Sequence, residues 1–266
     1  MNKIEIENGK LKFKSINNEI DFNYIELNDL FQIFEYELNI KSDTALTIKI
    51  NLNMEARFLI NINLLENISL NLNIISIGNK GKIQYKYNLK ANSKCNVSKF
   101  QNVDNIREMV MINLNGENSD IEYNFKNIAK GFEKYDYFVY HNSINSISNI
   151  KNNGVCIENG KMAYQVSSYV PKDVTGCICN QSNRIINLTE NECSIKPNLY
   201  IDCNDVSANH SALVGNFSKD ELFYLQSRGL NKNDAIKLLL SGFLTSDITC
   251  RELIDEIRKA IELYWR

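Results

Sequence analysis

The stretch IKINLNMEARFLININL, residues 48–64, decides the fold class because its side chains alternate with a period of two. Apolar Ile48, Ile50 and Leu52 alternate with polar residues, and Phe58 and Ile60 resume the pattern after a short interruption. Successive side chains of a β-strand point to opposite faces of the sheet, so this alternation predicts strands with one buried face.

The same alternation extends in both directions from this stretch. Its apolar positions include Ile4, Ile6, Leu11, Phe13, Ile68, Leu70, Leu72, Ile74, Ile83, Tyr85, Tyr87, Leu89, Ile112, Leu114, Ile121, Tyr123 and Phe125. Turn residues recur roughly every 8–12 residues, and Asn8-Gly9 has the composition of a hairpin turn. Many short half-buried strands predict an all-β region, although residues 24–38 fit either a strand or a short helix.

The turns between these strands are rich in Asn and almost free of Pro. We place them at Asn79–Gly81, Ala91–Lys94, Asn115–Ser119, Asn152–Gly154 and Glu158–Gly160. Asn is the non-glycine residue that best tolerates the left-handed conformation, so stacked turns with repeated Asn would suit a β-solenoid. A sandwich or a barrel fits the period equally well, and no strict sequence repeat decides among the three.

After residue 217 the period changes from 2 to 3.6, which predicts helices. Ser218 and Glu221 form a capping-box pattern, and Gly229 would end that first helix in a left-handed position. Asn231 is expected to cap a second helix, and Thr245 or Ser246 a third. Arg251–Asp255 and Arg258–Glu262 are expected i,i+4 pairs on the third helix. We therefore expect a β domain over residues 1–217 and a helical module over residues 218–266.

Composition narrows the class of protein. The 266 residues carry a formal net charge of −2, which gives no global attraction to nucleic acid or to an acidic membrane. The N-terminus lacks the apolar run of a signal peptide, and no stretch approaches 18 uninterrupted apolar residues. Seven cysteines without a regular spacing suit reduced thiols. These features predict a cytoplasmic protein that binds neither nucleic acid nor membrane.

Few residues offer catalytic or metal-binding chemistry. His141 and His210 are the only histidines, which limits His-based catalysis and His-rich metal sites. GNKGK (78–82) lacks the spacing of a phosphate-binding loop, so no bound nucleotide is expected. Cys177 and Cys179 would lie on the same face of a strand, and soft thiolates suit iron–sulfur clusters, copper or zinc. Buried, inert thiols are the commoner outcome for such residues.

The C-terminal third contains two characteristic segments, KPNLYIDCNDVSANHSALVG (196–215) and KDELFYLQSRGLNKNDAIKLLLSGF (219–243). Upstream, LNGENSDIEYN (114–124) and ENGKMAYQ (158–165) have the form of successive turns. Together these segments resemble the SufB/SufD family of iron–sulfur cluster assembly proteins, closely over 196–245 and more loosely over 105–195. The chain resembles a short SufD-like form.

The resemblance implies a right-handed parallel β-helix followed by a C-terminal helical module. It also implies a non-enzymatic scaffold that docks a SufC-like ABC ATPase through its C-terminal helices. The partner would hold the nucleotide, and the working pair would be this chain with a SufB-like paralogue or with a second copy of itself. A transient iron–sulfur cluster would be assembled at the interface of that pair, with the part played by a flavin left open.

Residue by residue, His210 matches the histidine that SufD-type chains place at the assembly interface. SufB-type chains carry a glutamate where this chain has Ser211, and an essential cysteine where our alignment places Ser182. These departures favour the SufD-like role, with the partner supplying most of the cluster ligands. Cys203, Cys177 and Cys179 are further candidate ligands.

The resemblance also assigns an ATPase-docking surface to the helices. Its expected residues are Phe223, Tyr224, Leu225, Arg228, Gly229, Leu239 and Phe243. Some of them are expected to pack the helices together instead, since a small helical module needs a core. The alternative function is a carbohydrate-binding or adhesive β-helix without a role in iron–sulfur chemistry.

Overall fold

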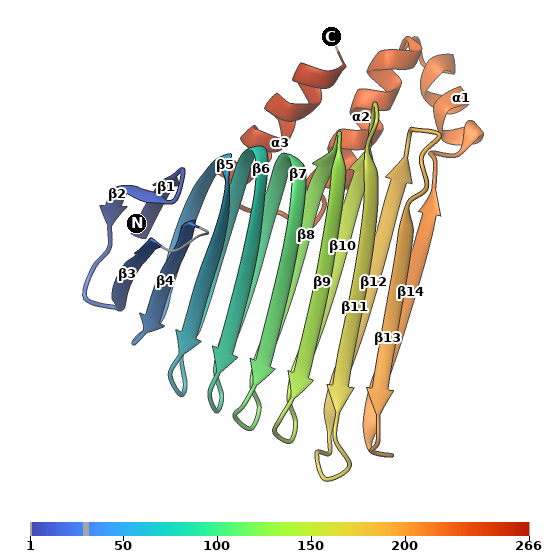
Figure 1. The fold of residues 1–266 in the computed structure, drawn as a ribbon. Helices are drawn as coiled ribbons and strands as arrows, with labels where there is room; N and C mark the ends of the chain where they lie inside the picture. Colours follow the sequence, from blue (N-terminus) through green and yellow to red (C-terminus); the bar gives the residue numbers. More distant parts are fainter. Residues whose placement is uncertain (1, 29–31, 266) are drawn as a thin grey trace.

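The computed structural model describes residues 2–28 and 32–265 and is a parallel β-solenoid with three C-terminal helices (Figure 1). The strands are β1 (Asn2–Glu7), β2 (Lys10–Ser15), β3 (Ile20–Asn28), β4 (Gln32–Ile40), β5 (Thr44–Leu64), β6 (Ser69–Leu89), β7 (Lys94–Leu114), β8 (Asp120–Ala129), β9 (Phe132–His141), β10 (Ile147–Cys156), β11 (Lys161–Val170), β12 (Cys177–Asn187), β13 (Ser194–Ile201) and β14 (Val206–Gly215). The helices are α1 (Lys219–Ser227), α2 (Lys232–Thr245) and α3 (Arg251–Tyr264). The solenoid is thus the architecture adopted among the three that the period allowed.

Each turn of the solenoid contributes one segment to each of two facing layers. β8, β10, β12 and β14 pair in parallel in one layer, and β9, β11 and β13 pair in parallel in the other. β5, β6 and β7 are long enough to bend from the first layer into the second. Stacked residues of successive turns are 25 residues apart in the pair Asn71–Asn96 and 31 residues apart in the pair Asn152–Asn183. The later turns are therefore longer than the earlier ones. Toward the N-terminus the parallel pairing continues through β6 and β5 to β4 and β1.

The core between the two layers is built by the alternation predicted from the sequence. Ile83, Tyr85 and Tyr87 are buried, whereas Lys82 is exposed and Lys86 is half-buried on the opposite side. The inward positions hold an unusual number of tyrosines, namely Tyr36, Tyr85, Tyr87, Tyr123, Tyr135, Tyr137 and Tyr164. Their rings pack edge-on in the pairs Tyr87–Tyr123 and Tyr123–Tyr137 and stack in the pair Tyr85–Tyr87.

Asparagine stacks form the turns at one edge of the solenoid. Asn67, Asn92, Asn118 and Asn145 all have φ between 54° and 59°, the left-handed region that Asn tolerates. The Nδ2 of Asn92 donates to Oδ1 of Asn67 at 3.0 Å, and that of Asn118 to Asn92 at 3.0 Å. Repeated Asn turns therefore stack as a solenoid requires. The turn expected at Asn152–Gly154 is wrong, because these residues lie inside β10.

Two hairpins close the N-terminal end. β1 and β2 pair antiparallel around Asn8 (φ 50°) and Gly9 (φ 79°), which confirms the predicted hairpin turn. β3 and β4 also pair antiparallel, so the ambiguous segment 24–38 is strand on both sides of residues 29–31, which lie outside the described residues.

Helices α1 and α2 begin where the sequence predicts. The Ser218 side chain accepts from the backbone N–H of Glu221, whose carboxylate accepts from the Ser218 N–H, and Gly229 follows α1 with φ 95°. Asn231 caps α2. The expected cap of the third helix is wrong, because α2 continues to Thr245 and α3 starts after Cys250.

The hydroxyls of Thr245 and Ser246 explain that difference. They donate back to the carbonyl oxygens of Ser241 and Phe243, so they complete the end of α2 instead of starting a helix. The expected ion pairs of α3 are also absent among the described residues. Glu262 pairs with Lys237 of α2, which brings the two helices together.

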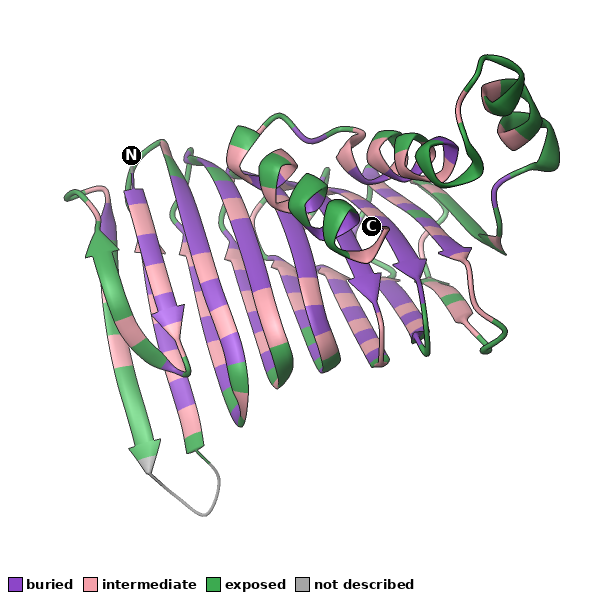
Figure 2. Ribbon diagram, turned by 90° about the horizontal axis from the view of Figure 1, so that it is seen from above, coloured by how far each residue is buried: buried purple, intermediate pink, exposed green. Residues whose placement is uncertain are grey.

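Helices α2 and α3 cover the outer face of the first layer (Figure 2). They share one apolar cluster with outward-facing residues of the strands, which are Ile75, Phe100, Ile128, Val155 and Ile186. The helix side of the cluster is Leu240, Leu244, Leu253, Ile257, Ala260 and Ile261. Helix α1 has no buried residue. No helix within the described residues is long and apolar enough to span a membrane.

One ion pair lies wholly inside the solenoid. Lys99 and Glu108, from the two halves of β7, are each fully buried and form a charge-assisted hydrogen bond. The Lys99 ammonium also lies 4.3 Å from the centre of the Tyr85 ring. Burial lowers the pKa of Lys99 and raises the pKa of Glu108, and each partner opposes the other's shift. The charges are therefore tolerated only as a pair.

We expect Glu108→Gln to lower the free energy of unfolding by about 3–5 kcal/mol, because it leaves the Lys99 charge buried without its partner. The double variant Lys99→Met, Glu108→Leu removes both charges and should be closer to the wild type than the single variant. Urea unfolding followed by circular dichroism measures both. Equal stability of E108Q and wild type would contradict this account of the pair.

The Asn stack gives a second expectation. Asn92→Ala should destabilise the protein by about 1–2 kcal/mol, because alanine pays for the left-handed conformation and the stack loses its hydrogen bonds. Asn96→Ala is the matched control, since Asn96 bonds to Asn71 at 3.0 Å from within a regular strand. Urea midpoints should fall more for N92A than for N96A, and the reverse order would show that the turn conformation is not the cause.

Candidate functional site

His210 lies at the open C-terminal end of the solenoid. It is exposed on β14, which pairs with β12 and with no further strand of the described residues. Its register partner is Gln181, whose amide donates inward to Ser168 Oγ at 2.9 Å and to the Asn198 carbonyl at 3.1 Å. Residues in parallel register share a face, so His210 is on the inner face of β14, beyond which no further strand of the described residues pairs.

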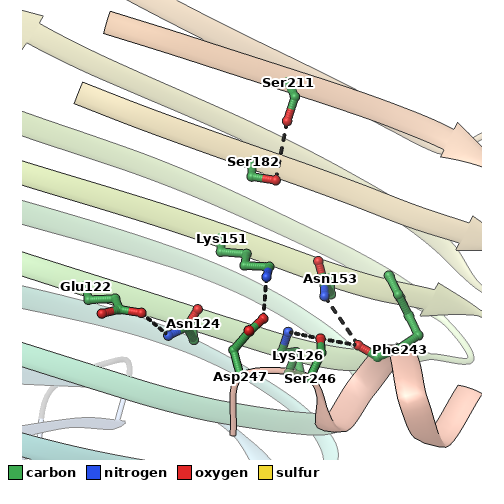
Figure 3. Close-up of polar contacts among 10 residues, drawn as sticks. All are labelled: Glu122, Asn124, Lys126, Lys151, Asn153, Ser182, Ser211, Phe243, Ser246 and Asp247. Carbon is green, nitrogen blue, oxygen red and sulfur yellow. Dashed lines mark hydrogen bonds and ion pairs between the residues drawn. The ribbon is translucent and has the colours of Figure 1, made fainter. Parts of the chain in front are cut away.

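Ser182 and Ser211 meet on the opposite, outer face. They are register partners, and their hydroxyls are 3.3 Å apart (Figure 3). The two positions where SufB-type chains are expected to carry cysteine and glutamate are thus neighbours here. A polar groove of about 360 Å³ crosses β8, β10, β12 and β14 beside them. Its lining is Glu122, Asn124, Asn149, Ile150, Lys151, Asn180, Gln181, Ser182, Asn209, His210 and Ser211.

Cys177 and Cys179 share one buried face of β12, as their spacing predicts. The sulfur of Cys179 is 3.2 Å from Nε2 of His141, and that of Cys177 is 3.3 Å from Ser146 Oγ. Burial raises the pKa of Cys179 to about 12 and lowers the pKa of His141 to about 4. Both groups are therefore neutral near pH 7, and their hydrogen-bond partners do not include His210.

Cys203 lies just after β13, in the turn that leads to β14. It is half-buried, and its sulfur accepts the backbone N–H of Asp205 at 3.4 Å. Within residues 2–28 and 32–265, no three His, Cys, Asp or Glu side chains converge as a metal site would require. The candidate ligands therefore remain predictions.

The seven expected docking residues divide into two groups. Phe223 and Tyr224 of α1 are 73% and 57% exposed, and the Arg228 guanidinium lies 5.3 Å from the Tyr224 ring. Leu239 and Phe243 of α2 instead pack against the cluster shared with the strands. Leu225 is half-buried, and Gly229 ends α1. The exposed group forms an apolar and cationic surface, which we call the α1 face (Phe223, Tyr224 and Arg228).

A set of polar contacts that the sequence did not reveal fixes the end of α2 to the solenoid. This anchoring cluster consists of Lys126, Lys151, Asn153, Ser246 and Asp247 (Figure 3). Lys151 pairs with Asp247, and Lys126 Nζ donates to Ser246 Oγ at 3.4 Å and to the side-chain oxygen of Asn153 at 2.8 Å. In the sequence, the one hint of this cluster was Lys126, a charged residue within the apolar strand segment NFKNIA.

The anchoring cluster predicts a pH dependence of stability. Burial, with the nearby Lys151 charge, lowers the pKa of Lys126 from 10.5 to about 8 in the folded protein. Between about pH 8 and 10.5 the unfolded chain then binds more protons than the folded one, so this group makes stability rise with pH. Lys126→Met should remove that increment from unfolding curves at pH 7.5 and 10, whereas the exposed Lys82→Met should keep it.

Comparison with known proteins places these features in a family. Residues 61–243 match the family model described as "SUF system FeS cluster assembly, SufBD core domain". The SufD protein of Bacillus subtilis is 42% identical over 65 residues, which is 24% of this chain and 15% of that protein. The SufD protein of Escherichia coli is 40% identical over 52 residues, 20% of this chain and 12% of that protein.

A plant protein shows the same pattern. Protein ABCI7, chloroplastic, of Arabidopsis thaliana is 35% identical over 72 residues, 26% of this chain and 15% of that protein. The chain therefore aligns with 12–15% of the length of these three curated relatives. The family model covers more than half of the chain, from the half of β5 that lies in the second layer to helix α2. The chain therefore belongs to the SufBD core-domain family of the SUF iron–sulfur cluster assembly system.

Proposed function

We propose that this protein is a non-catalytic, SufD-like scaffold subunit of a cytoplasmic SUF-type iron–sulfur cluster assembly complex. In this proposal the helices dock a SufC-like ABC ATPase, and the open end of the solenoid pairs with a SufB-like paralogue or a second copy of the chain. The cluster is the cargo that the pair assembles. Family membership favours this role over a carbohydrate-binding or adhesive one.

The observation that carries the docking role is the exposure of the α1 face. Helix α1 buries none of its residues, yet it presents two aromatic side chains to solvent. Exposed aromatic and arginine side chains dominate the binding energy of many protein interfaces. Helix α2 is anchored to the solenoid by its core residues and by the anchoring cluster, so force on α1 would be passed to the strands.

The open strand edges support the pairing role. β13 and β14 each have one edge without a strand partner in the described residues, as do β2 and β3 in the antiparallel hairpins of the N-terminal end. Unpaired strand edges present backbone donors and acceptors to another chain. Tyr200 and Leu213, 53% and 54% exposed, lie on these two strands. His210 would thereby reach the interface between the subunits.

In this proposal the two subunits of the pair share the task of supplying ligands to the iron–sulfur cluster. An imidazole at His210 can bind iron or transfer a proton. Ser182 and Ser211 supply neither thiolate nor carboxylate, so those ligands would come from the partner. GNKGK lies in the bend of β6 between two strand segments and does not precede a helix, so the ATPase partner would hold the nucleotide.

The docking proposal predicts the effect of changes to the α1 face. We expect Phe223→Ser with Tyr224→Ser to weaken binding of the cognate SufC-type ATPase by roughly 30-fold or more, as loss of central aromatic anchors does. Size-exclusion chromatography with light scattering gives the mass of the complex, and titration gives the affinity.

Leu263→Ser is the matched control, because Leu263 is an equally exposed apolar residue, 53%, on α3. It should bind the ATPase as the wild type does. The proposal fails if the folded full-length chain does not bind the ATPase at micromolar concentrations, even with its paralogue present. Undiminished binding by the double variant would remove the α1 face from the interface.

A further inference from the structure

Two cysteines that are distant in sequence meet at the last full turn of the solenoid. Cys156 is the final residue of β10, and Cys193 immediately precedes β13. Their sulfur atoms are 3.1 Å apart, a contact in which one thiol donates to the other. None of the other five cysteines makes such a thiol–thiol contact within the described residues. The pair spans the two layers, because β10 belongs to the first and β13 to the second.

Solvent can reach one member of the pair. Cys156 is fully buried, whereas Cys193 is half-buried at the end of the loop 188–193. That loop folds over the preceding turn, with Asn187 donating to the Asn191 carbonyl at 2.8 Å and Asn191 to the Gly160 carbonyl at 3.4 Å. These contacts hold Cys193 against Cys156 while leaving its outer side accessible.

The surroundings make Cys193 the more reactive thiol. The hydrogen bond from the Cys156 thiol lowers the pKa of Cys193 to about 7, with help from the Met162 backbone N–H and the Lys161 charge. The same hydrogen bond and burial raise the pKa of Cys156. The thiolate is the nucleophilic form of cysteine, so Cys193 attacks and Cys156 resolves.

We propose that Cys156 and Cys193 are a peroxide-sensitive thiol pair that closes to a disulfide across the last full turn. The Cys193 thiolate attacks one oxygen of hydrogen peroxide, the O–O bond breaks, and the departing hydroxide takes up a proton to become water. The sulfur of Cys156 then attacks the Cys193 sulfenic acid. The S–O bond breaks, the hydroxyl leaves with the Cys156 proton as a second water, and the S–S bond forms.

The disulfide would tie the edge strand β13 to β10 of the opposite layer. Among the described residues β13 pairs with β11 alone, and the loop 188–193 leads directly into its first residue. A covalent link at Cys193 would restrain that loop and the start of β13. This inference stands apart from the proposed function, since it requires neither the ATPase nor a cluster.

The test uses the reduced full-length chain, treated with hydrogen peroxide and then titrated for free thiols in denaturant. The wild type should fall from seven thiols to five. Cys193→Ser should keep its remaining six, and the matched control Cys250→Ser should still lose two. Digestion with trypsin and chymotrypsin should yield one linked pair of peptides, joining Cys156 to Cys193. The rate of disulfide formation should rise with pH around a midpoint near 7.

The proposal is overturned if the wild type keeps seven thiols, or if the linked peptides contain other cysteines. It is also overturned if Cys193 is oxidised to the sulfinic acid while Cys156 remains a free thiol. Both substitutions change half-buried cysteines and keep the fully buried Cys156, so each variant is expected to fold. The urea midpoint of the wild type should rise on oxidation, and that of Cys193→Ser should not.

Discussion

Parallel pairing of each turn with the next is the constraint on which the rest of the structure depends. Between β6 and β7 the register runs from Ser69 opposite Lys94 to Leu89 opposite Leu114, through the bend that joins the two layers. Equivalent positions of successive turns must therefore stack on one another. A slip of one residue would move every inward side chain to the surface. The Asn turns, the tyrosine-rich core and the buried Lys99–Glu108 pair are all consequences of this stacking.

The two ends of the solenoid differ in a way that sets its polarity. Antiparallel hairpins form the N-terminal end, with β2 and β3 outermost, whereas the parallel strands β13 and β14 form the other end. The side chains that could bind a metal or react lie toward the C-terminal end of the solenoid. They are His210, Cys203 and the Cys156–Cys193 pair. The helices also differ from one another in burial. Residues of α2 and α3 share an apolar core with strand residues, whereas α1 has no buried residue. The proposed docking role would use both the anchored helices and the exposed one.

The local residue pattern predicted the structure most reliably where local chemistry determines it. The period of two located the strands, and the side chains of Ser218 and Asn231 located two helix starts. It failed at the third helix, where the hydroxyls of Thr245 and Ser246 serve the end of α2. It also took Asn152–Gly154 for a turn, although neighbouring strands hold that segment extended inside β10. In both cases a contact made after folding overrode the local preference.

The strand-rich fold class, the helical C-terminus and the family motifs around His210 follow from the amino-acid sequence alone, because they rest on periodicity and on residues close together in the chain. Only the tertiary structure decided which residues meet. Cys156 and Cys193 are 37 residues apart, Cys179 and His141 are 38 apart, and Lys151 and Asp247 are 96 apart. The physical reason is that solenoid turns of unequal length, from 25 to 31 residues, set the alignment of one turn on another. That alignment is a property of the folded stack of turns, and no local pattern specifies it.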